Sequence, residues 1–115
     1  MTTKTTYIPY NANIDIWKCG LALTNDSDVD ETVLLIIKEG KTGRKHRKEV
    51  KVGANKIELL GGAELPTDTF SIKMESSEHI HMSQLQLAMK GGDILGFGCF
   101  PIKEMEGNLG KTTKT

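Results

Sequence analysis

Three aspartates recur at alternate positions in the segment 25–31, which reads NDSDVDE. Asp26, Asp28 and Asp30 have the spacing with which a calcium-binding loop begins, and Ca²⁺ needs several carboxylate oxygens that converge on it. The sixth position of such a loop requires a glycine and the twelfth a bidentate glutamate, but this chain has Glu31 and Ile37 there. The segment is better explained as an acidic, solvated turn, so we predict no metal in it.

Two histidines, His79 and His81, lie two residues apart and therefore share one face of an expected strand. Two imidazoles can ligate a metal together, with Glu78 or His46 as further ligands only if the fold brings them close. The spacing fixes no third ligand. We therefore interpret both histidines as exposed strand residues and predict no metal and no cofactor.

No residue has the setting of a catalytic nucleophile. Residues 107–112 end like a phosphate-binding loop, but Met105 occupies the position five residues before Gly110 where that motif needs a glycine. Cys19 and Cys99 have apolar neighbours, which is typical of buried, unreactive thiols in a reducing compartment; a disulfide between them is the alternative. We predict no catalytic residue and no enzymatic activity.

A basic run between residues 41 and 51 is the strongest charge feature of the chain. Its candidate interaction residues are Lys41, Arg44, Lys45, Arg47 and Lys48. Such a run can bind phosphates, and a solvated hairpin tip explains it equally well. Proteins that bind single-stranded nucleic acid interleave aromatic side chains for stacking, and none occurs between Trp17 and Phe70, so nucleic acid is not an expected partner.

These charged segments flank an apolar stretch around which we expect the fold to be organised. Residues 14–24 alternate, with Trp17, Cys19, Leu21 and Leu23 on one face, which predicts a half-buried strand. Residues 33–37 form an unbroken, β-branched apolar run, which is typical of a strand covered on both faces.

The remaining pattern is also strand-like, with turn residues every 8–12 positions. A polar turn is expected at residues 11–13, and residues 57–64 could instead hold one helical turn. Further strands are predicted over residues 7–10 (an edge, because of Pro9), 44–52, 57–60, 70–75, 79–89 (bent by a bulge near Ser83) and 94–100 (the last core strand). This predicts an all-β fold: a single antiparallel β-sandwich of about seven or eight short strands, Ig-like or jelly-roll-like.

Composition is consistent with one globular domain. The 115 residues are 37% hydrophobic and 26% charged, and the formal net charge is zero. We expect a flexible N-terminal tail over residues 1–6, the sandwich over residues 7–104 and a flexible C-terminal tail over residues 105–115. No apolar run approaches the ~20 residues of a membrane helix, and residues 1–10 lack a signal-peptide core, so we expect no membrane and a cytoplasmic location.

Two short motifs resemble known sandwich proteins. The segments YIPY (7–10) and GLALTNDSD (20–28), with Trp17 between them, resemble a small β-sandwich module of bacterial and phage proteins. The segments LPTDTF (65–70) and IKMES (72–76) look like the sensory-rhodopsin transducer family, a kindred sandwich that forms ring-like tetramers. The resemblance implies a non-catalytic module that assembles or binds.

The chain also departs from the transducer pattern. His79 stands where that family has a proline, and Gln84 and Gln86 occur where it has a glutamine and an arginine. These departures weaken any inference of a transducer-type binding surface.

The charge arrangement supplies the functional hypothesis. An eight-residue strand separates its ends by roughly 26 Å, so acidic residues 26, 28, 30 and 31 should lie at one end and the basic run at the other. Like modules can then dock pole to pole or side by side, and head-to-tail contacts form rings or filaments. We predict a homo-oligomeric structural protein whose partner is itself or a scaffold protein, such as a capsid decoration protein of a virion assembled in a bacterial cytoplasm; the alternative is a soluble, ring-forming transducer or ligand-binding module.

Overall fold

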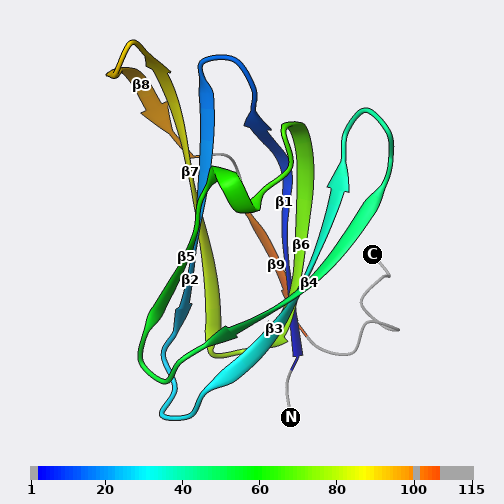
Figure 1. The fold of residues 1–115 in the computed structure, drawn as a ribbon. Helices are drawn as coiled ribbons and strands as arrows, with labels where there is room; N and C mark the ends of the chain where they lie inside the picture. The colour runs from blue at the N-terminus through cyan, green and yellow to red at the C-terminus, as the bar shows by residue number, and fades with distance from the viewer. Residues whose placement is uncertain (1–2, 100–101, 107–115) are drawn as a thin grey trace.

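The computed structural model describes residues 3–99 and 102–106, and within them the chain forms two antiparallel sheets (Figure 1). The strands are β1 (Thr3–Asn13), β2 (Trp17–Asn25), β3 (Glu31–Glu39), β4 (Lys45–Val52), β5 (Ile57–Leu60), β6 (Asp68–Ser77), β7 (Ile80–Lys90), β8 (Asp93–Gly98) and β9 (Lys103–Glu106). A 3₁₀ turn, η1 (Gly62–Glu64), lies between β5 and β6, which is the helical turn left open for this segment.

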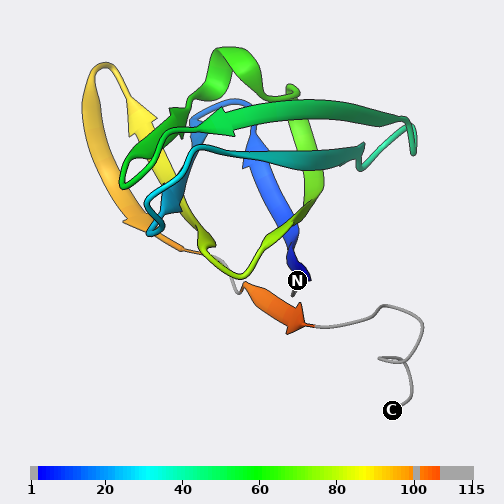
Figure 2. The same ribbon diagram turned by 90° about the horizontal axis from the view of Figure 1, so that it is seen from below.

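The two sheets pack as a sandwich, so the predicted fold class is confirmed. The five-stranded sheet has the order β4-β3-β6-β1-β9 and the four-stranded sheet the order β5-β2-β7-β8. Seen from below, the β3–β4 hairpin crosses the body and projects beyond it (Figure 2). Strand β9, which the sequence pattern did not predict, pairs with residues 4–7 of β1.

The core lies between the inner faces of the two sheets because apolar residues alternate along most strands. It contains Ile8, Cys19, Leu21, Leu23, Val33, Leu35, Ile37, Val50, Val52, Leu60, Leu65, Phe70, Ile72, Met74, Ile80 and Met82. Strand β3 buries Val33, Leu35 and Ile37 inward, while Leu34 and Ile36 are half-buried on the opposite face. The unbroken apolar run is therefore covered more completely on one face than on the other.

Strand β1 begins at Thr3, so residues 3–6 belong to the sandwich and are not the predicted tail. Lys4, Thr5 and Thr6 are buried, and the Lys4 ammonium is satisfied by contacts with His81 and Glu104. The tail was predicted from polarity alone, but β-branched threonines favour a strand. At the other end β9 continues to Glu106, and residues 107–115 lie outside the described part of the chain.

The polar turn predicted at residues 11–13 is also wrong. Asn11 and Ala12 are buried in β1, after an irregularity between Ile8 and Asn11 that contains Pro9. Because β9 covers β1 only to Tyr7, Pro9 lies on a locally uncovered edge, as its missing N–H requires. The chain turns instead at residues 14–16, where Asp15 has a φ of 57° and Trp17 N donates to Ile14 O at 2.9 Å.

Strand β7 contradicts the predicted bulge near Ser83. It pairs with β2 in continuous register from Asn25–Ile80 to Trp17–Ala88, so its alternation never changes phase. Gln84 and Gln86 therefore point inward and are buried, whereas Leu85 points outward. An apolar phase change was taken for a bulge, but the strand has apolar residues on both faces.

The buried glutamines are satisfied by a polar network between the sheets. Gln86 Oε1 accepts from Ala12 N at 3.1 Å, and Gln86 Nε2 donates to Ala12 O at 2.7 Å and to Lys18 O at 2.9 Å. Gln84 Nε2 donates to Asn11 Oδ1 at 3.0 Å, and Asn11 Nδ2 donates to Phe70 O at 3.2 Å. The network thus ties the irregular end of β1 to β7.

Strand β8 is not the predicted core strand. Ile94, Leu95 and Phe97 are 59%, 60% and 78% exposed, because β8 lies at the sheet edge. Cys19 and Cys99 are both free thiols; Cys19 is buried, as expected, but Cys99 is exposed, so the expected pair of buried thiols is wrong. Burial raises the pKa of the Cys19 thiol to about 11.

Candidate functional site

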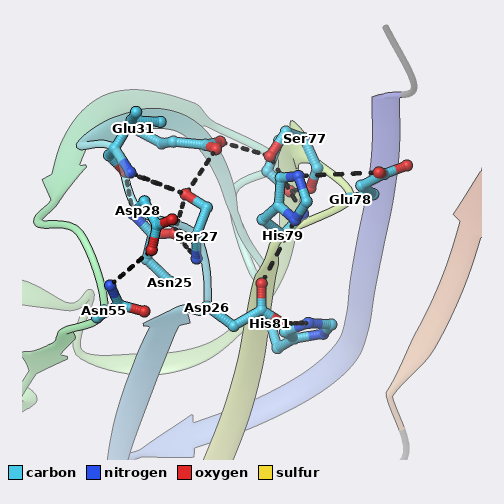
Figure 3. Close-up of polar contacts among 12 residues, drawn as sticks. Asn25, Asp26, Ser27, Asp28, Glu31, Asn55, Ser77, Glu78, His79 and His81 are labelled. Carbon is cyan, nitrogen blue, oxygen red and sulfur yellow. Dashed lines mark hydrogen bonds and ion pairs between the residues drawn. The ribbon is translucent and has the colours of Figure 1, made fainter.

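The acidic segment forms an ordered loop between β2 and β3. Buried Asn25 organises it: Asn25 Nδ2 donates to Val29 O at 2.8 Å and to Val52 O at 3.0 Å, while Asn25 Oδ1 accepts from Ser27 N at 2.9 Å. Glu31 links the loop to the β6–β7 turn through a hydrogen bond from the Ser77 hydroxyl. Residues far apart in the sequence are thereby held at one end of the sandwich (Figure 3).

The three aspartates of this loop do not converge. Asp28 Oδ1 accepts from Asn55 Nδ2 at 3.3 Å, and Asp30 Oδ1 accepts from Ala54 N at 2.9 Å while Asp30 Oδ2 lies 3.3 Å from Lys51 Nζ. The hydrogen bond from Ala54, aided by Lys51, lowers the pKa of Asp30. Each carboxylate therefore has its own partner, which is the arrangement of an acidic turn and not of a calcium loop.

Asp26 turns instead toward the two histidines (Figure 3). Its Oδ1 lies 3.4 Å from His79 Nδ1, and its Oδ2 lies 3.2 Å from His81 Nε2. Lys4 Nζ donates to His81 Nδ1 at 3.2 Å and also lies 3.5 Å from Glu104 Oε2. A neutral His81 with its proton on Nε2 satisfies both contacts, since it accepts from the ammonium and donates to the carboxylate.

This cluster bears on the question of a metal. His46 forms a pair with Glu39 at the other end of the molecule, so it is not a ligand candidate here. Within residues 3–99 and 102–106, no group of three or more histidine, cysteine, aspartate or glutamate side chains has an arrangement that could hold a metal ion. The side chains of Asp26, His79 and His81 are about half-exposed.

A groove of about 640 Å³ lies beside the acidic loop, on the outward side of the five-stranded sheet. Asp30, Glu31, Glu49 and Glu75 contribute carboxylates to its lining. Glu49 and Glu75 both pair with Leu34 across the strands, so these three residues lie in one row of the sheet. The acidic surface is therefore larger than the loop predicted from the sequence.

The basic segment forms the β3–β4 hairpin, whose turn was correctly predicted. Gly43 has a φ of 73°, and a Cβ at Gly40 would lie 2.5 Å from Thr69 Oγ1, so glycine is needed at both positions. His46 Nε2 lies 2.6 Å from Glu39 Oε2, and Thr42 Oγ1 donates to Glu39 Oε1 at 2.8 Å; together these bonds lower the pKa of Glu39.

The predicted basic residues divide into paired and unpaired side chains. Lys41 Nζ lies 3.1 Å from Asp68 Oδ2 and lowers the pKa of Asp68. Arg44, Lys45, Arg47 and Lys48 are exposed and form no ion pair with another described residue. Lys45 and Arg47 face outward from the five-stranded sheet, whereas Lys48 pairs with inward-facing Leu35 and lies on the opposite face.

Further cations join Lys45 and Arg47 on this outer face. Lys38 belongs to the same hairpin, whereas Lys73 and Lys103 are distant in the chain, so no local sequence pattern indicates them. Lys38 lies directly opposite Lys45, Lys73 shares Ile36 as a neighbour with Arg47, and Lys103 lies across Tyr7 from Lys73. Like charges directly opposite on a sheet destabilise it. We call this surface, formed by Lys38, Lys45, Arg47, Lys73 and Lys103, the basic row.

The two charged regions lie at opposite ends of β3, as predicted. In Figure 1 the loop before β3 is at the bottom, and the hairpin tip after β3 is at the upper right. Lys51 is an exception within the basic run, since it lies beside the acidic loop and pairs with Asp30. No helix in the described part of the chain is long and apolar enough to cross a membrane.

The architecture defines an antiparallel β-sandwich of five and four strands. A crystal structure described as that of Thermotoga maritima 1070 is similar to it, with a TM-score of 0.65 and 15% identity over 91% of this chain and 92% of that chain. This likeness extends over nearly the whole fold and concerns the fold alone. No protein-family model matches the chain, and no curated protein matches it.

Proposed function

We propose that this protein is a non-catalytic structural module that assembles with copies of itself, head to tail, through its oppositely charged ends. The observation that carries the proposal is the separation of charge along the β3–β4 hairpin. One end presents Asp30 and Glu31 of the acidic groove, and the hairpin tip presents cations without an ion-pair partner among the described residues. The groove extends along the sheet to Glu49 and Glu75, which lie in the row next to Arg47 and Lys73.

The unpaired cations need an explanation outside the single chain. Lys38 and Lys45 face each other across the strands, which is unfavourable in an isolated sheet. Carboxylates from a neighbouring molecule relieve this repulsion when they approach the basic row. The acidic groove has a suitable charge, and the projecting hairpin that carries Arg44 is a suitable shape to reach it.

A contact between different surfaces of identical molecules is heterologous. It forms a ring if the rotation between molecules closes and a filament if it does not. Charge pairing at such a contact fixes orientation and register more than it raises affinity, and salt screens it. The proposed setting follows from the phage-type sequence motifs: a virion accessory such as a capsid decoration protein, assembled in a bacterial cytoplasm.

The test is a pair of complementary variants. Lys45→Glu/Arg47→Glu reverses two charges of the basic row, and Glu49→Lys/Glu75→Lys reverses two of the four carboxylates of the groove. Each variant alone therefore weakens the attraction between the two surfaces. Size-exclusion chromatography with light scattering at about 50 mM NaCl should show association of the wild type, about tenfold weaker association of each variant, and restored association when the two are mixed.

Lys90→Glu is the control, because it reverses the charge of an exposed lysine outside the two surfaces. It should associate as the wild type does. Monomeric wild-type protein at low salt, or mixed variants that stay monomeric while the wild type associates, would remove the head-to-tail proposal.

A further inference from the structure

The outer face of the four-stranded sheet is apolar, and nothing in the described part of the chain covers it. Ile57 and Leu59 from β5, Leu85 and Leu87 from β7, and Ile94 and Phe97 from β8 form this surface, which we call the apolar face. Phe97 is 78% exposed, Leu59 70%, Ile57 60%, Ile94 59% and Leu85 44%. Soluble monomers rarely expose so many large apolar side chains in one contiguous patch.

The register shows that these side chains share one face. Phe97 lies opposite Leu87, and Ile94 lies opposite Met89. The buried residues of β7 alternate and are Ile80, Met82, Gln84, Gln86 and Ala88, so the residues between them point outward. This is the apolar phase that the sequence pattern assigned to the core, and the fold places it at the surface instead.

The apolar face also contains a groove. A groove of about 480 Å³ has the small residues Gly20, Ala22 and Ser83 in its lining, together with the larger Leu59 and Leu85. Ala22 pairs with Leu59 on one side and with Ser83 on the other, so the groove follows β2 between two higher strands. Such a trough between ridges accepts the side chains of a second apolar sheet.

We propose that the apolar face is an interface at which a second copy of this chain docks, face to face, to give a four-layer stack of sheets. The argument begins with charge. Among the outward positions of β2, β5, β7 and β8 described here, Lys18 is the one lysine, arginine, aspartate or glutamate.

An interface related by a two-fold axis sets the same surface against itself, so it tolerates little net charge. The apolar face meets this condition. The outer face of the five-stranded sheet does not, because it carries charges of both signs, with Glu49 and Glu75 in the row next to Arg47 and Lys73, and a dry interface would desolvate them all. Of the two outer faces, the apolar face is therefore the one suited to a dry two-fold contact.

The area is also suitable. Fully exposed large apolar side chains present on the order of 150–200 Å² each, so the five exposed residues together offer roughly 500 Å². Half-buried Leu87 and Met89, Cys99 and the backbone extend this toward the roughly 800 Å² per partner of a standard interface.

Outside the described residues 3–99 and 102–106, the sequence contains three large apolar residues, Met1, Phe100 and Leu109, which are far apart in the chain. A second copy brings the same apolar residues again, and two sheets stack at about 10 Å with their side chains interdigitated.

The main test is the variant Leu59→Asn/Phe97→Asn, with Tyr10→Asn as the control. Tyr10 is 48% exposed in β1, so the control removes exposed apolar surface outside the apolar face and the acidic groove. Sedimentation equilibrium from about 1 to about 500 µM should give a wild-type dimer that persists in about 1 M NaCl, a double variant with a dissociation constant at least about 30-fold higher, and an unchanged control.

Cys99 supplies a second readout that needs no substitution. It is exposed in the single chain and lines the groove, whereas Cys19 is buried and serves as the internal reference. Docking of a second copy should lower the alkylation rate of Cys99 about tenfold as protein concentration rises through the dimer range, in the wild type but not in the double variant.

The inference goes beyond the proposed function, and the two fail separately. A wild type that is monomeric at about 500 µM, a double variant that dimerises normally, or a Cys99 rate independent of concentration overturns the apolar interface. A dimer that resists salt and charge reversal but is lost in Leu59→Asn/Phe97→Asn supports the interface and removes the head-to-tail proposal. Association that is lost on charge reversal but persists in Leu59→Asn/Phe97→Asn supports the head-to-tail proposal and removes the apolar interface.

Discussion

Strands β6 and β7 are consecutive and joined by a tight turn, yet they distribute polarity in opposite ways. β6 buries Phe70, Ile72 and Met74 and exposes Lys73. β7 buries Gln84 and Gln86 in its middle and leaves Leu85 44% exposed. β6 therefore has apolar side chains on its core side alone, whereas β7 has apolar side chains on its outer side and a polar bridge within the sandwich.

The largest expected effect on the free energy of unfolding is in β6. Ile72 is fully buried in β6, so Ile72→Ala should lower the free energy of unfolding by about 2–5 kcal/mol through lost burial and the cavity that remains. Urea denaturation followed by circular dichroism measures it, and Ile72→Val should cost only about 0.5–1.5 kcal/mol. Equal losses for both variants would show that the core relaxes around β6.

The buried amide of β7 comes next. Gln86→Met keeps a similar volume but removes the hydrogen bonds to Ala12 N, Ala12 O and Lys18 O. The unfolding free energy should fall by about 1–3 kcal/mol because buried backbone groups lose their partners. Leu23→Met, in the fully buried core of β2, is the control for the change of shape and should cost less than about 1.5 kcal/mol.

These two strands also show what the sequence could and could not predict. The alternation of Phe70, Ile72 and Met74 was sufficient for β6, and glycines 40 and 43 located the hairpin turn. Alternation fails for β7, because Leu85 and Leu87 look like core residues when a single chain is assumed to bury every apolar face. Gln86 bonds to backbone atoms of Ala12 in β1, and no local sequence pattern predicts these partners.

The candidate site was predicted in the same uneven way. The acidic loop and basic hairpin are local in sequence, so their positions at opposite ends of β3 could be inferred. The basic row depends on strand order, since Lys73 and Lys103 join Arg47 only after β3, β6, β1 and β9 are placed side by side. Likewise Asp26 meets His79 and His81 only because the β2–β3 loop and the β6–β7 turn lie at one end.

The outward residue of β7 should give a smaller effect, and one that depends on protein concentration. At about 1 µM, Leu85→Gln should change the unfolding free energy by no more than about 0.5 kcal/mol, because the side chain is partly solvated. If a second copy covers the apolar face, the loss grows as the wild type is stabilised at high concentration. Thermal melts across a range of concentrations distinguish this from a fixed cost, which would mean that Leu85 acts within one chain.

The smallest expected effect is the response of the β3–β4 hairpin to acid. Glu39 is held in its charged form by His46 and Thr42, so its pKa is lowered in the folded protein. A lowered carboxyl pKa contributes stability at pH values above the ordinary glutamate pKa of about 4.3, and this contribution is lost as pH falls through the lowered native value. Below pH ~4, the amide protection factors, which are corrected for the intrinsic pH dependence of exchange, should therefore fall in the β3–β4 hairpin. The β7–β8 hairpin, whose turn is formed by Gly91 and Gly92, is the internal comparison and should change less.

The variant Glu39→Gln tests which carboxylate is responsible. It should abolish the difference between the two hairpins in their response to acid. A difference that survives would belong to another carboxylate, and Asp68, whose pKa is lowered by Lys41, is the first candidate.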